Sequence, residues 1–291
     1  MIRSPYPTLR RWGGALAMAV AASPLLGCSG ANLVNALTPT AGYSVRQDLA
    51  YGAAPRQRLD LYVPDGADRD TPLLVFFYGG NWQSGSKELY RFVGQAFASR
   101  GYVTAIPDYR VWPEARYPDF IADGAAAIAW LRDEPQVGDG RRLFLAGHSA
   151  GAYIAAMLAL DRRWLGEAGC GPVTAAAGLA GPYDFLPLTD PTLIEIFGPA
   201  DAQTQPVHHV AAGDPPMLLA TGTADTTVRP RNSVVLAERL QVVGVPAQVV
   251  EYQGVGHVGI VAALAAPLRF LAPVLDDVDG FLRSQPGCPA G

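Results

Sequence analysis

Serine, histidine and aspartate residues that together could cleave an acyl bond follow separate apolar segments of this 291-residue chain. Ser149 lies within Gly147-His-Ser-Ala-Gly151, directly after the apolar run Leu143–Ala146 and directly before a helix-favouring run. A strand that stops at a serine between small residues and continues as a helix is typical of a nucleophile elbow. The N–H groups at the start of that helix would face the reacting oxygen. We therefore predict that Ser149 is a nucleophile.

A serine is a weak nucleophile at neutral pH, so it needs a base, and the base needs an orienting carboxylate. Among the four histidines, His257 follows the last strand-like segment, in a loop whose glycines let it reach across the sheet edge. His148 adjoins the serine and cannot easily fold back onto it, and His208 and His209 lie in an irregular stretch. The sequence therefore predicts His257 as the base.

The orienting carboxylate is predicted from its place relative to the strands. Asp225 lies just past the apolar segment Met217–Thr221, whereas Asp214 precedes that segment and would lie at its opposite end. Asp184 and Asp190 follow the preceding apolar segment and stay open as alternatives. Asp225 is the first candidate, since catalytic residues gather at the carboxyl ends of parallel strands.

Short apolar segments alternate with helical patterns along the chain and predict the elements that position these residues. The strands predicted are 43–51, 58–63, 73–77, 102–106, 143–146, 174–179, 217–221 and 247–252. The helices predicted are 87–100, 120–132, one directly after Ser149, 231–243, and one or two over 258–283. The first two strands read as an edge hairpin, and the rest as strands buried on both faces. The fold class predicted is α/β, with a mostly parallel eight-stranded sheet, helices on both faces and a small cap.

The composition limits the possible partners. Hydrophobic residues make up 49% of the chain and charged residues 16%, which suits one large core in a domain over residues 43–291. The pI near 5.5 and the absence of a Lys/Arg cluster after residue 11 argue against nucleic-acid binding. No ligand spacing typical of a metal site is present, so we expect no metal and no organic cofactor.

The first residues resemble an export signal rather than part of the fold. Arginines precede an apolar run, 13–26, that is too short to span a bilayer as a mature helix. Leu25-Leu-Gly-Cys28 resembles a bacterial lipobox, which predicts a signal peptide over 1–28, lipidation of Cys28, a tether over 29–42 and an exported, membrane-anchored protein. The alternative is an ordinary signal peptide cleaved near Ala22 or Gly27. Removal of residues 1–28 would change the formal net charge from −4 to −7, because it removes three arginines and no acidic residue.

Two cysteines, Cys170 and Cys288, would remain after such cleavage. In an exported protein they can pair, and both a disulfide and two free thiols stay open.

Three further stretches add to these motifs: Arg58-Leu-Asp-Leu-Tyr-Val-Pro64, Tyr78-Gly-Gly-Asn-Trp82, and Asp108-Tyr-Arg110. Together with the serine motif and the order serine, aspartate, histidine, they make residues 43–283 resemble the α/β-hydrolase superfamily. The likeness is closer to esterases of the hormone-sensitive-lipase and feruloyl/acetyl-xylan esterase (BD-FAE) groups and to kynurenine formamidases.

The resemblance implies an oxyanion hole formed by the backbone N–H groups of Gly80, Asn81 and Ala150. The related groups usually carry a histidine where this chain has Tyr78. Aromatic and neighbouring side chains in these loops are predicted to line the substrate pocket: Trp82, His148 and Tyr183, with Trp112, Phe185 and Phe197 as further candidates. We interpret Asp60 and the Asp108–Arg110 stretch as structural.

The segment 180–216 is long, irregular and contains seven prolines. Long loops at this position of an α/β-hydrolase form a cap over the nucleophile. The segment is too short for a large mobile lid, so we expect a partly covered site that prefers acyl chains of about two to six carbons.

The expected activity is that of a serine hydrolase that cleaves short-chain or aryl carboxylic esters through an acyl-enzyme. The nearest alternative is an arylformamidase or other amidase of the kynurenine formamidase type. An esterase acting on acetylated or feruloylated polysaccharide is a third possibility. A lipid-anchored binding protein on a hydrolase scaffold, without catalysis, is the alternative from another class. The sequence leaves the oligomeric state open.

Overall fold

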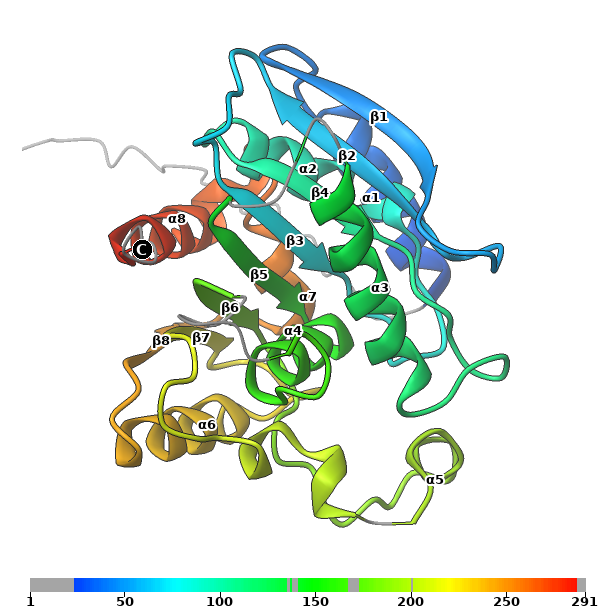
Figure 1. The fold of residues 1–291 in the computed structure, drawn as a ribbon, viewed down its shortest axis with the longest axis vertical. Helices are drawn as coiled ribbons and strands as arrows, with labels where there is room; N and C mark the ends of the chain where they lie inside the picture. Colours follow the sequence, from blue (N-terminus) through cyan, green and yellow to red (C-terminus); the bar gives the residue numbers. More distant parts are fainter. Residues whose placement is uncertain (1–23, 135–136, 138–140, 167–172, 200, 287–291) are drawn as a thin grey trace, which may run out of the picture.

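The computed structural model describes residues 24–134, 137, 141–166, 173–199 and 201–286. Its strands are β1 (Tyr43–Ala50), β2 (Arg58–Pro64), β3 (Leu73–Phe77), β4 (Val103–Pro107), β5 (Leu143–His148), β6 (Ala175–Leu179), β7 (Met217–Gly222) and β8 (Ala247–Tyr252). They form one open sheet in the order β1-β2-β4-β3-β5-β6-β7-β8 (Figure 1). The pairs β1–β2 and β2–β4 are antiparallel and all others parallel. The predicted fold class and edge hairpin are confirmed.

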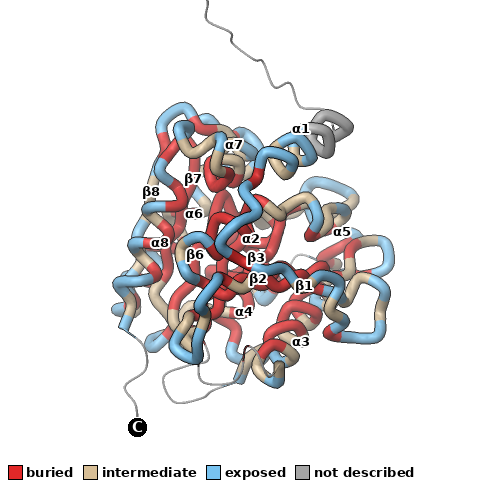
Figure 2. Tube along the Cα trace, turned by 90° about the horizontal axis from the view of Figure 1, so that it is seen from above, coloured by how far each residue is buried: buried red, intermediate tan, exposed pale blue. Residues whose placement is uncertain are grey.

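Helices cover both faces of this sheet. The helices are α1 (Pro24–Ala36), α2 (Arg91–Ala98), α3 (Asp119–Asp133), α4 (Ala150–Leu160), α5 (Pro191–Phe197), α6 (Arg231–Val242), α7 (His257–Ala262) and α8 (Val274–Ser284), with 3-10 turns η1 (Lys87–Tyr90), η2 (Ala202–Thr204), η3 (Pro206–His208) and η4 (Ala266–Leu271). Helices α3 and α4 contact each other, as do α2 and α8. Figure 2 shows α2 and α4 on opposite sides of the central strands.

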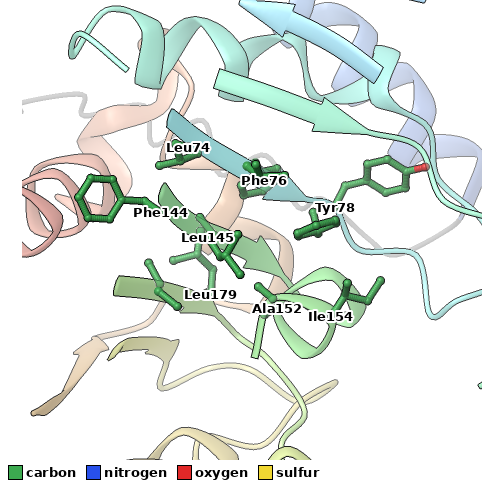
Figure 3. Packing of buried hydrophobic residues seen from close by; sticks show 14 of the residues in the cluster. Leu74, Phe76, Tyr78, Phe144, Leu145, Ala152, Ile154 and Leu179 are labelled. Carbon is green, nitrogen blue, oxygen red and sulfur yellow. The ribbon is translucent and has the colours of Figure 1, made fainter. Parts of the chain in front are cut away.

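The core lies against the two central strands, β3 and β5, in which every residue is buried. Side chains from these strands pack with those of β6 and α4 (Figure 3). Helix α4 is rich in alanine, and all its residues except Ala159 are buried. Small side chains let a helix approach a sheet closely, so the chain after β5 turns directly back onto the core.

Two helical predictions are refined by the structure. The segment predicted as one helix over 87–100 is η1 followed by α2. Lys87, the first residue of η1, is buried, and its ammonium lies 3.1 Å from the Asp60 carboxylate. The closing segment, predicted as one or two helices, forms α7, η4 and α8. Asp60 lies in β2, so the ion pair between Lys87 and Asp60 joins η1 to the edge hairpin.

Helix α1 occupies residues that the sequence predicts as the end of a signal peptide and the start of a tether. Asn35 holds it in place: its amide nitrogen donates to the carbonyl of Glu88 at 2.7 Å, and its amide oxygen accepts from the N–H of Phe92 at 3.1 Å. Thr38 is buried just beyond. Residues 29–42 thus include the end of a helix docked on η1 and α2. That this segment acts as a tether stays a prediction.

Within the described part of the chain, no helix has the length and hydropathy needed to cross a bilayer. The predictions for Cys170 and Cys288 lie outside the described residues, as does most of the predicted signal peptide, 1–23.

Candidate active site

The turn from β5 into α4 holds Ser149 in a backbone conformation that side chains rarely adopt. Its φ is 54° and its ψ −124°. Its N–H donates to the carbonyl of Leu179 on β6 at 2.9 Å, which ties the turn to the neighbouring strand. A Cβ at Gly151 would lie 2.0 Å from the carbonyl oxygen of Phe77, and one at Gly147 would lie 2.3 Å from the carbonyl oxygen of Gly151. Gly151 is therefore required for the start of α4 to approach β3, and Gly147 for the end of β5 to approach the start of α4.

A row of hydrogen bonds joins Ser149, His257 and Asp225, although these residues lie up to 108 positions apart in the sequence. The Oγ of Ser149 lies 2.9 Å from Nε2 of His257, and Nδ1 of His257 lies 2.8 Å from Oδ2 of Asp225. The Asp225 side chain is fully buried and that of His257 is 14% exposed. A carboxylate that accepts from Nδ1–H leaves Nε2 as a lone-pair acceptor for the serine proton.

The carboxylate of Asp225 also stabilises the turn that follows β7. Its Oδ1 accepts from the N–H groups of Thr227 and Val228, each at 2.9 Å. Nearby, a Cβ at Gly222 would lie 2.1 Å from the carbonyl oxygen of Val255, so only glycine lets the two loops meet. Asp225 is thus fixed by three hydrogen bonds to its two carboxylate oxygens and by the surrounding turn.

The alternative carboxylates lie elsewhere. Asp184 forms an ion pair with Arg231 at 3.3 Å, and Asp190 accepts from the first N–H groups of α5. Asp214 accepts from the N–H of Ala211 at 2.7 Å. None of these three side chains has an interaction with His257 among the contacts of the described residues.

The loop after β3 lies against the serine. A Cβ at Gly79 would lie 2.9 Å from Cβ of Ser149, so the two backbones are in close approach. Gly80 and Asn81 follow with φ of 146° and 55°. Within the described residues, the N–H of Asn81 has no acceptor, and Ala150 begins α4, where an N–H has no partner in its own helix. These donors are available to an anion bound beside Ser149.

Tyr78, which replaces the expected histidine, is buried and holds this loop from beneath. Its hydroxyl lies 2.5 Å from Oδ1 of Asp108 and accepts from Nη2 of Arg56 at 2.9 Å. Its ring stacks between Tyr90 and Tyr109, with centroids 5.3 and 4.9 Å away. Figure 3 shows Tyr78 at the end of β3, next to the buried core.

Arg56 is a residue that the sequence does not single out. Its guanidinium donates to the carbonyls of Tyr109 and Gly85, both at 2.8 Å, as well as to Tyr78. It therefore joins the hairpin turn, the loop after β3 and the loop after β4. The only sequence signal is its position before the Arg58–Pro64 motif, which carries no information about these partners.

Trp82 is almost fully buried in a cluster of aromatic rings between the loop after β3 and the cap segment. Its ring centroid lies 4.8 Å from that of Phe197, 5.3 Å from that of Tyr153 and 5.9 Å from that of Phe185. Phe197 ends α5, so the cap segment packs directly on this cluster. The structure thus joins residues that the sequence treats as separate candidates for the substrate pocket.

Tyr183 and His148, the other two predicted pocket residues, are also buried. The hydroxyl of Tyr183 has no hydrogen-bond partner among the described residues and lies beside Gly178 and Gly181. His148 lies next to His257, with its Nε2 2.9 Å from the His257 carbonyl oxygen. A contact of these side chains with substrate stays a prediction. Among the described residues, no group of three or more His, Cys, Asp and Glu side chains is arranged to hold a metal ion.

Sequence comparison relates the chain to known enzymes. Residues 59–190 match the BD-FAE family model. The chain is 32% identical over 252 residues to the isoprenylcysteine alpha-carbonyl methylesterase of Arabidopsis thaliana. This alignment covers 77% of this chain and 58% of that protein. It is 30% identical over 141 residues to the kynurenine formamidase of Danio rerio, in an alignment that covers 48% of this chain and 47% of that protein. The chain thus spans about half the length of these curated relatives.

Structure comparison also relates the chain to esterases. The esterase 2 of Thermogutta terrifontis superposes with a TM-score of 0.68 at 28% identity, over 84% of this chain and 95% of that one. The superposed part of the chain is larger than residues 59–190, which match the BD-FAE family model. The chain belongs to the α/β-hydrolase superfamily and is similar within it to the carboxylesterases and the BD-FAE enzymes.

Proposed function

We propose that this protein hydrolyses carboxylic esters with short acyl or aryl groups, through an acyl-enzyme formed on Ser149. The observation that carries the proposal is the hydrogen-bonded row from Asp225 through His257 to Ser149 at 2.8 and 2.9 Å. It supplies a nucleophile, a base and an orienting carboxylate beside free backbone donors.

The reaction would proceed in two balanced halves. His257 Nε2 takes the proton of Ser149 as Oγ bonds to the ester carbonyl carbon, and the carbonyl oxygen becomes an oxyanion facing Asn81 and Ala150. The imidazolium then gives its proton to the leaving alkoxide as the carbon–oxygen bond breaks. Water, deprotonated by His257, attacks the acyl-enzyme, and the proton returns to Oγ as the acid leaves. Asp225 stays ionised throughout and stabilises the imidazolium.

The preference for short acyl chains is supported by the aromatic cluster around Trp82. Rings of Tyr153, Phe185 and Phe197 surround this indole, so the volume behind the loop after β3 is filled by protein. The Thermogutta terrifontis esterase has also been crystallised with butyrate and with propionate bound. Both acids fall in the chain-length range that we propose here.

A test of this proposal is a panel of p-nitrophenyl esters of rising chain length, together with aryl and sugar esters. The same panel is run with the Ser149→Ala protein. Ester hydrolysis that Ser149→Ala removes supports the proposal. Wild-type protein that hydrolyses none of these esters, or a Ser149→Ala protein that is as active as wild type, contradicts it.

A second candidate, cleavage of N-formyl aromatic amides, is favoured by the similarity to a kynurenine formamidase over 141 residues. The same triad would cleave such an amide, with His257 protonating the leaving amine. Activity on N-formylated aromatic amines without activity on p-nitrophenyl acetate would select this candidate. A non-catalytic binding protein would not need the three residues to be arranged in this way, and its Ser149 would be unreactive.

We also propose that residues 1–28 direct export and that Cys28 is lipidated. The motif Leu25-Leu-Gly-Cys28 supports this, and the contacts of Asn35 with η1 and α2 lie beyond the cleavage point, so processing would leave them intact. Two or more acyl chains are needed for stable membrane attachment. Mass spectrometry of the native protein is expected to give a modified Cys28 as its first residue. A different mature N-terminus would contradict the proposal.

A further inference from the structure

His148 lies between the catalytic histidine and the loop that lies against the serine. It is the last residue of β5, directly before Ser149, and only 4% of it is exposed. Its Nε2 lies 2.9 Å from the carbonyl oxygen of His257. A carbonyl oxygen can only accept, so Nε2 of His148 carries the hydrogen and donates it. The residue before the nucleophile thus bonds directly to the backbone of the proposed base.

The other edge of the imidazole faces the loop after β3. A Cβ at Gly79 would lie 3.0 Å from Nδ1 of His148. This Nδ1 is buried and has no hydrogen-bond partner among the described residues. A single ring therefore contacts the Gly79 backbone on one edge and the His257 backbone on the other.

The His148 ring also limits where the ring of His257 can lie. The two ring centroids are 4.8 Å apart, at an interplanar angle of 42°. On its remaining sides, His257 has Asp225 at Nδ1 and Ser149 at Nε2. The imidazole of His257 is thus held by its two catalytic partners, by its own backbone and by a neighbouring ring.

The charge state of His148 suits this position. Burial, together with the nearby His257, lowers the pKa of His148 to about 3, although its bond to the His257 carbonyl acts in the opposite direction. At neutral pH the ring is uncharged, so it does not compete with the imidazolium that forms on His257 during the reaction. The Nε2–H donor is present in every step.

We infer that His148 is a positioning residue, which fixes His257 between Asp225 and Ser149 through the Nε2–H bond to the His257 carbonyl and through ring contact. This inference rests on the catalytic role proposed for His257. It differs from the substrate contact that the sequence predicts for His148, because its polar donor is directed at the protein itself. Misplacement of a catalytic group by about 1 Å costs up to about 100-fold in rate.

The test compares two substitutions of His148. In His148→Gln the amide nitrogen extends about as far as Nε2 and keeps an N–H donor, whereas His148→Met has a similar length and no donor. The matched control is His209→Met. His209 also directs its Nε2 to a backbone carbonyl, that of Gln203 at 2.8 Å, but it lies in the cap segment and contacts no triad residue.

Three readouts separate positioning from general structure: kcat and KM on p-nitrophenyl butyrate, urea unfolding, and the NMR signal of the His257 Nδ1 proton bonded to Asp225. We expect His148→Met to lower kcat by about 10- to 100-fold, with KM within about threefold of wild type. The His257 proton signal is expected to broaden or disappear in His148→Met and to persist in His148→Gln, whose kcat recovers most of the loss. His209→Met should match wild type in kcat and in the proton signal.

Several outcomes would overturn the inference. These are a folded His148→Met protein with wild-type kcat and proton signal, or one in which KM rises and kcat does not change. If His148→Met does not fold, His148→Gln decides: wild-type kcat and signal support the inference, and loss of both overturns it. A wild-type protein that cleaves no ester would refute the proposed function, whereas the proton signal would still test the position of His257.

Discussion

The hydroxyl of Tyr78 lies 2.5 Å from a carboxylate oxygen of Asp108, and both residues are buried. Tyr78 follows β3 and Asp108 follows β4, so this hydrogen bond joins the ends of two adjacent parallel strands. The same carboxylate oxygen accepts from the N–H of Lys87 at 2.8 Å, and Arg56 donates to the Tyr78 hydroxyl. Tyr78 thus supports the loop on which the proposed oxyanion donors lie.

Removal of this hydroxyl tests the support directly. Tyr78→Phe keeps the stacked ring but leaves the Asp108 carboxylate and the Arg56 guanidinium short of a partner. The free energy of unfolding should fall by about 1–3 kcal/mol. Because the loop after β3 loses part of its support, kcat should fall by about 10-fold or more, as expected when oxyanion donors are misplaced. Urea unfolding and ester kinetics measure the two effects.

A control for this substitution is Tyr43→Phe. The Tyr43 hydroxyl donates to the carbonyl of Pro39 at 2.8 Å, at the far edge of the sheet. Its loss should change stability slightly and kcat not at all. Equal kcat for Tyr78→Phe and wild type would show that the loop does not depend on the Tyr78–Asp108 bond.

Asp225→Asn should leave the fold intact and remove most activity. The amide oxygen can still accept from Thr227 and Val228, whereas the amide nitrogen would donate to Nδ1 of His257 and force the proton onto Nε2. With the wrong tautomer, His257 cannot accept the serine proton, and kcat should fall by about 10⁴-fold. Asp184→Asn, at the alternative carboxylate, should retain activity within about threefold. The opposite ranking of the two variants would assign the role to Asp184.

Acyl-chain length gives a prediction about the cap segment. Rates on p-nitrophenyl esters should rise over about two to six carbons, with each methylene that contacts an apolar wall adding up to about 0.8 kcal/mol, and then fall. No increase is expected above the solubility limit of the ester, because the segment 180–216 holds only one short α-helix and two 3-10 turns among its described residues. A rate that still climbs at twelve carbons would show a longer acyl site than we propose.

The low pKa of His148 predicts a pH dependence of stability. The pKa of His148 is about 3 in the folded protein and about 6.5 when the chain is unfolded, since burial and the neighbouring His257 disfavour its charge. Between these values the unfolded chain binds a proton that the folded chain excludes, so the free energy of unfolding falls as pH falls and is unaffected above pH 7. The loss from pH 6 to pH 4 is on the order of 2–3 kcal/mol.

Urea unfolding of wild type and His148→Gln over this pH range measures that difference. Carboxylates contribute alike to both proteins, so the wild-type curve should fall more steeply below about pH 6.5. Parallel curves would mean that His148 is charged or exposed in the folded state.

The sequence is sufficient to predict the sheet and the close approach of Ser149, His257 and Asp225, because the signals are local. The continuous apolar runs of β3 and β5 identify central strands, and the small residues around Ser149 identify a turn that only glycine permits. Asp225 and His257 each come shortly after the end of a strand, so parallel pairing of β7 and β8 is enough to place them at one edge of the sheet. The fold and superfamily predicted in this way are confirmed.

What the sequence does not predict depends on contacts between distant segments. Arg56 reaches three loops, and the bond from His148 to the carbonyl of His257 spans 109 residues. Asn35 docks helix α1 through contacts with Glu88 and Phe92, which no local pattern in residues 29–42 indicates. Such partners are fixed by packing of the whole domain, not by the periodicity of one segment.

The measurement that most directly tests the central claim is labelling with a fluorophosphonate probe, followed by peptide mass spectrometry. Only a serine activated by a base reacts readily with this probe. The account predicts stoichiometric labelling of Ser149 in wild type and in the control Ser44→Ala, which alters the exposed edge strand β1, and no labelling in Ser149→Ala. A label on any other serine, or labelling that persists in a folded Ser149→Ala protein, would contradict it.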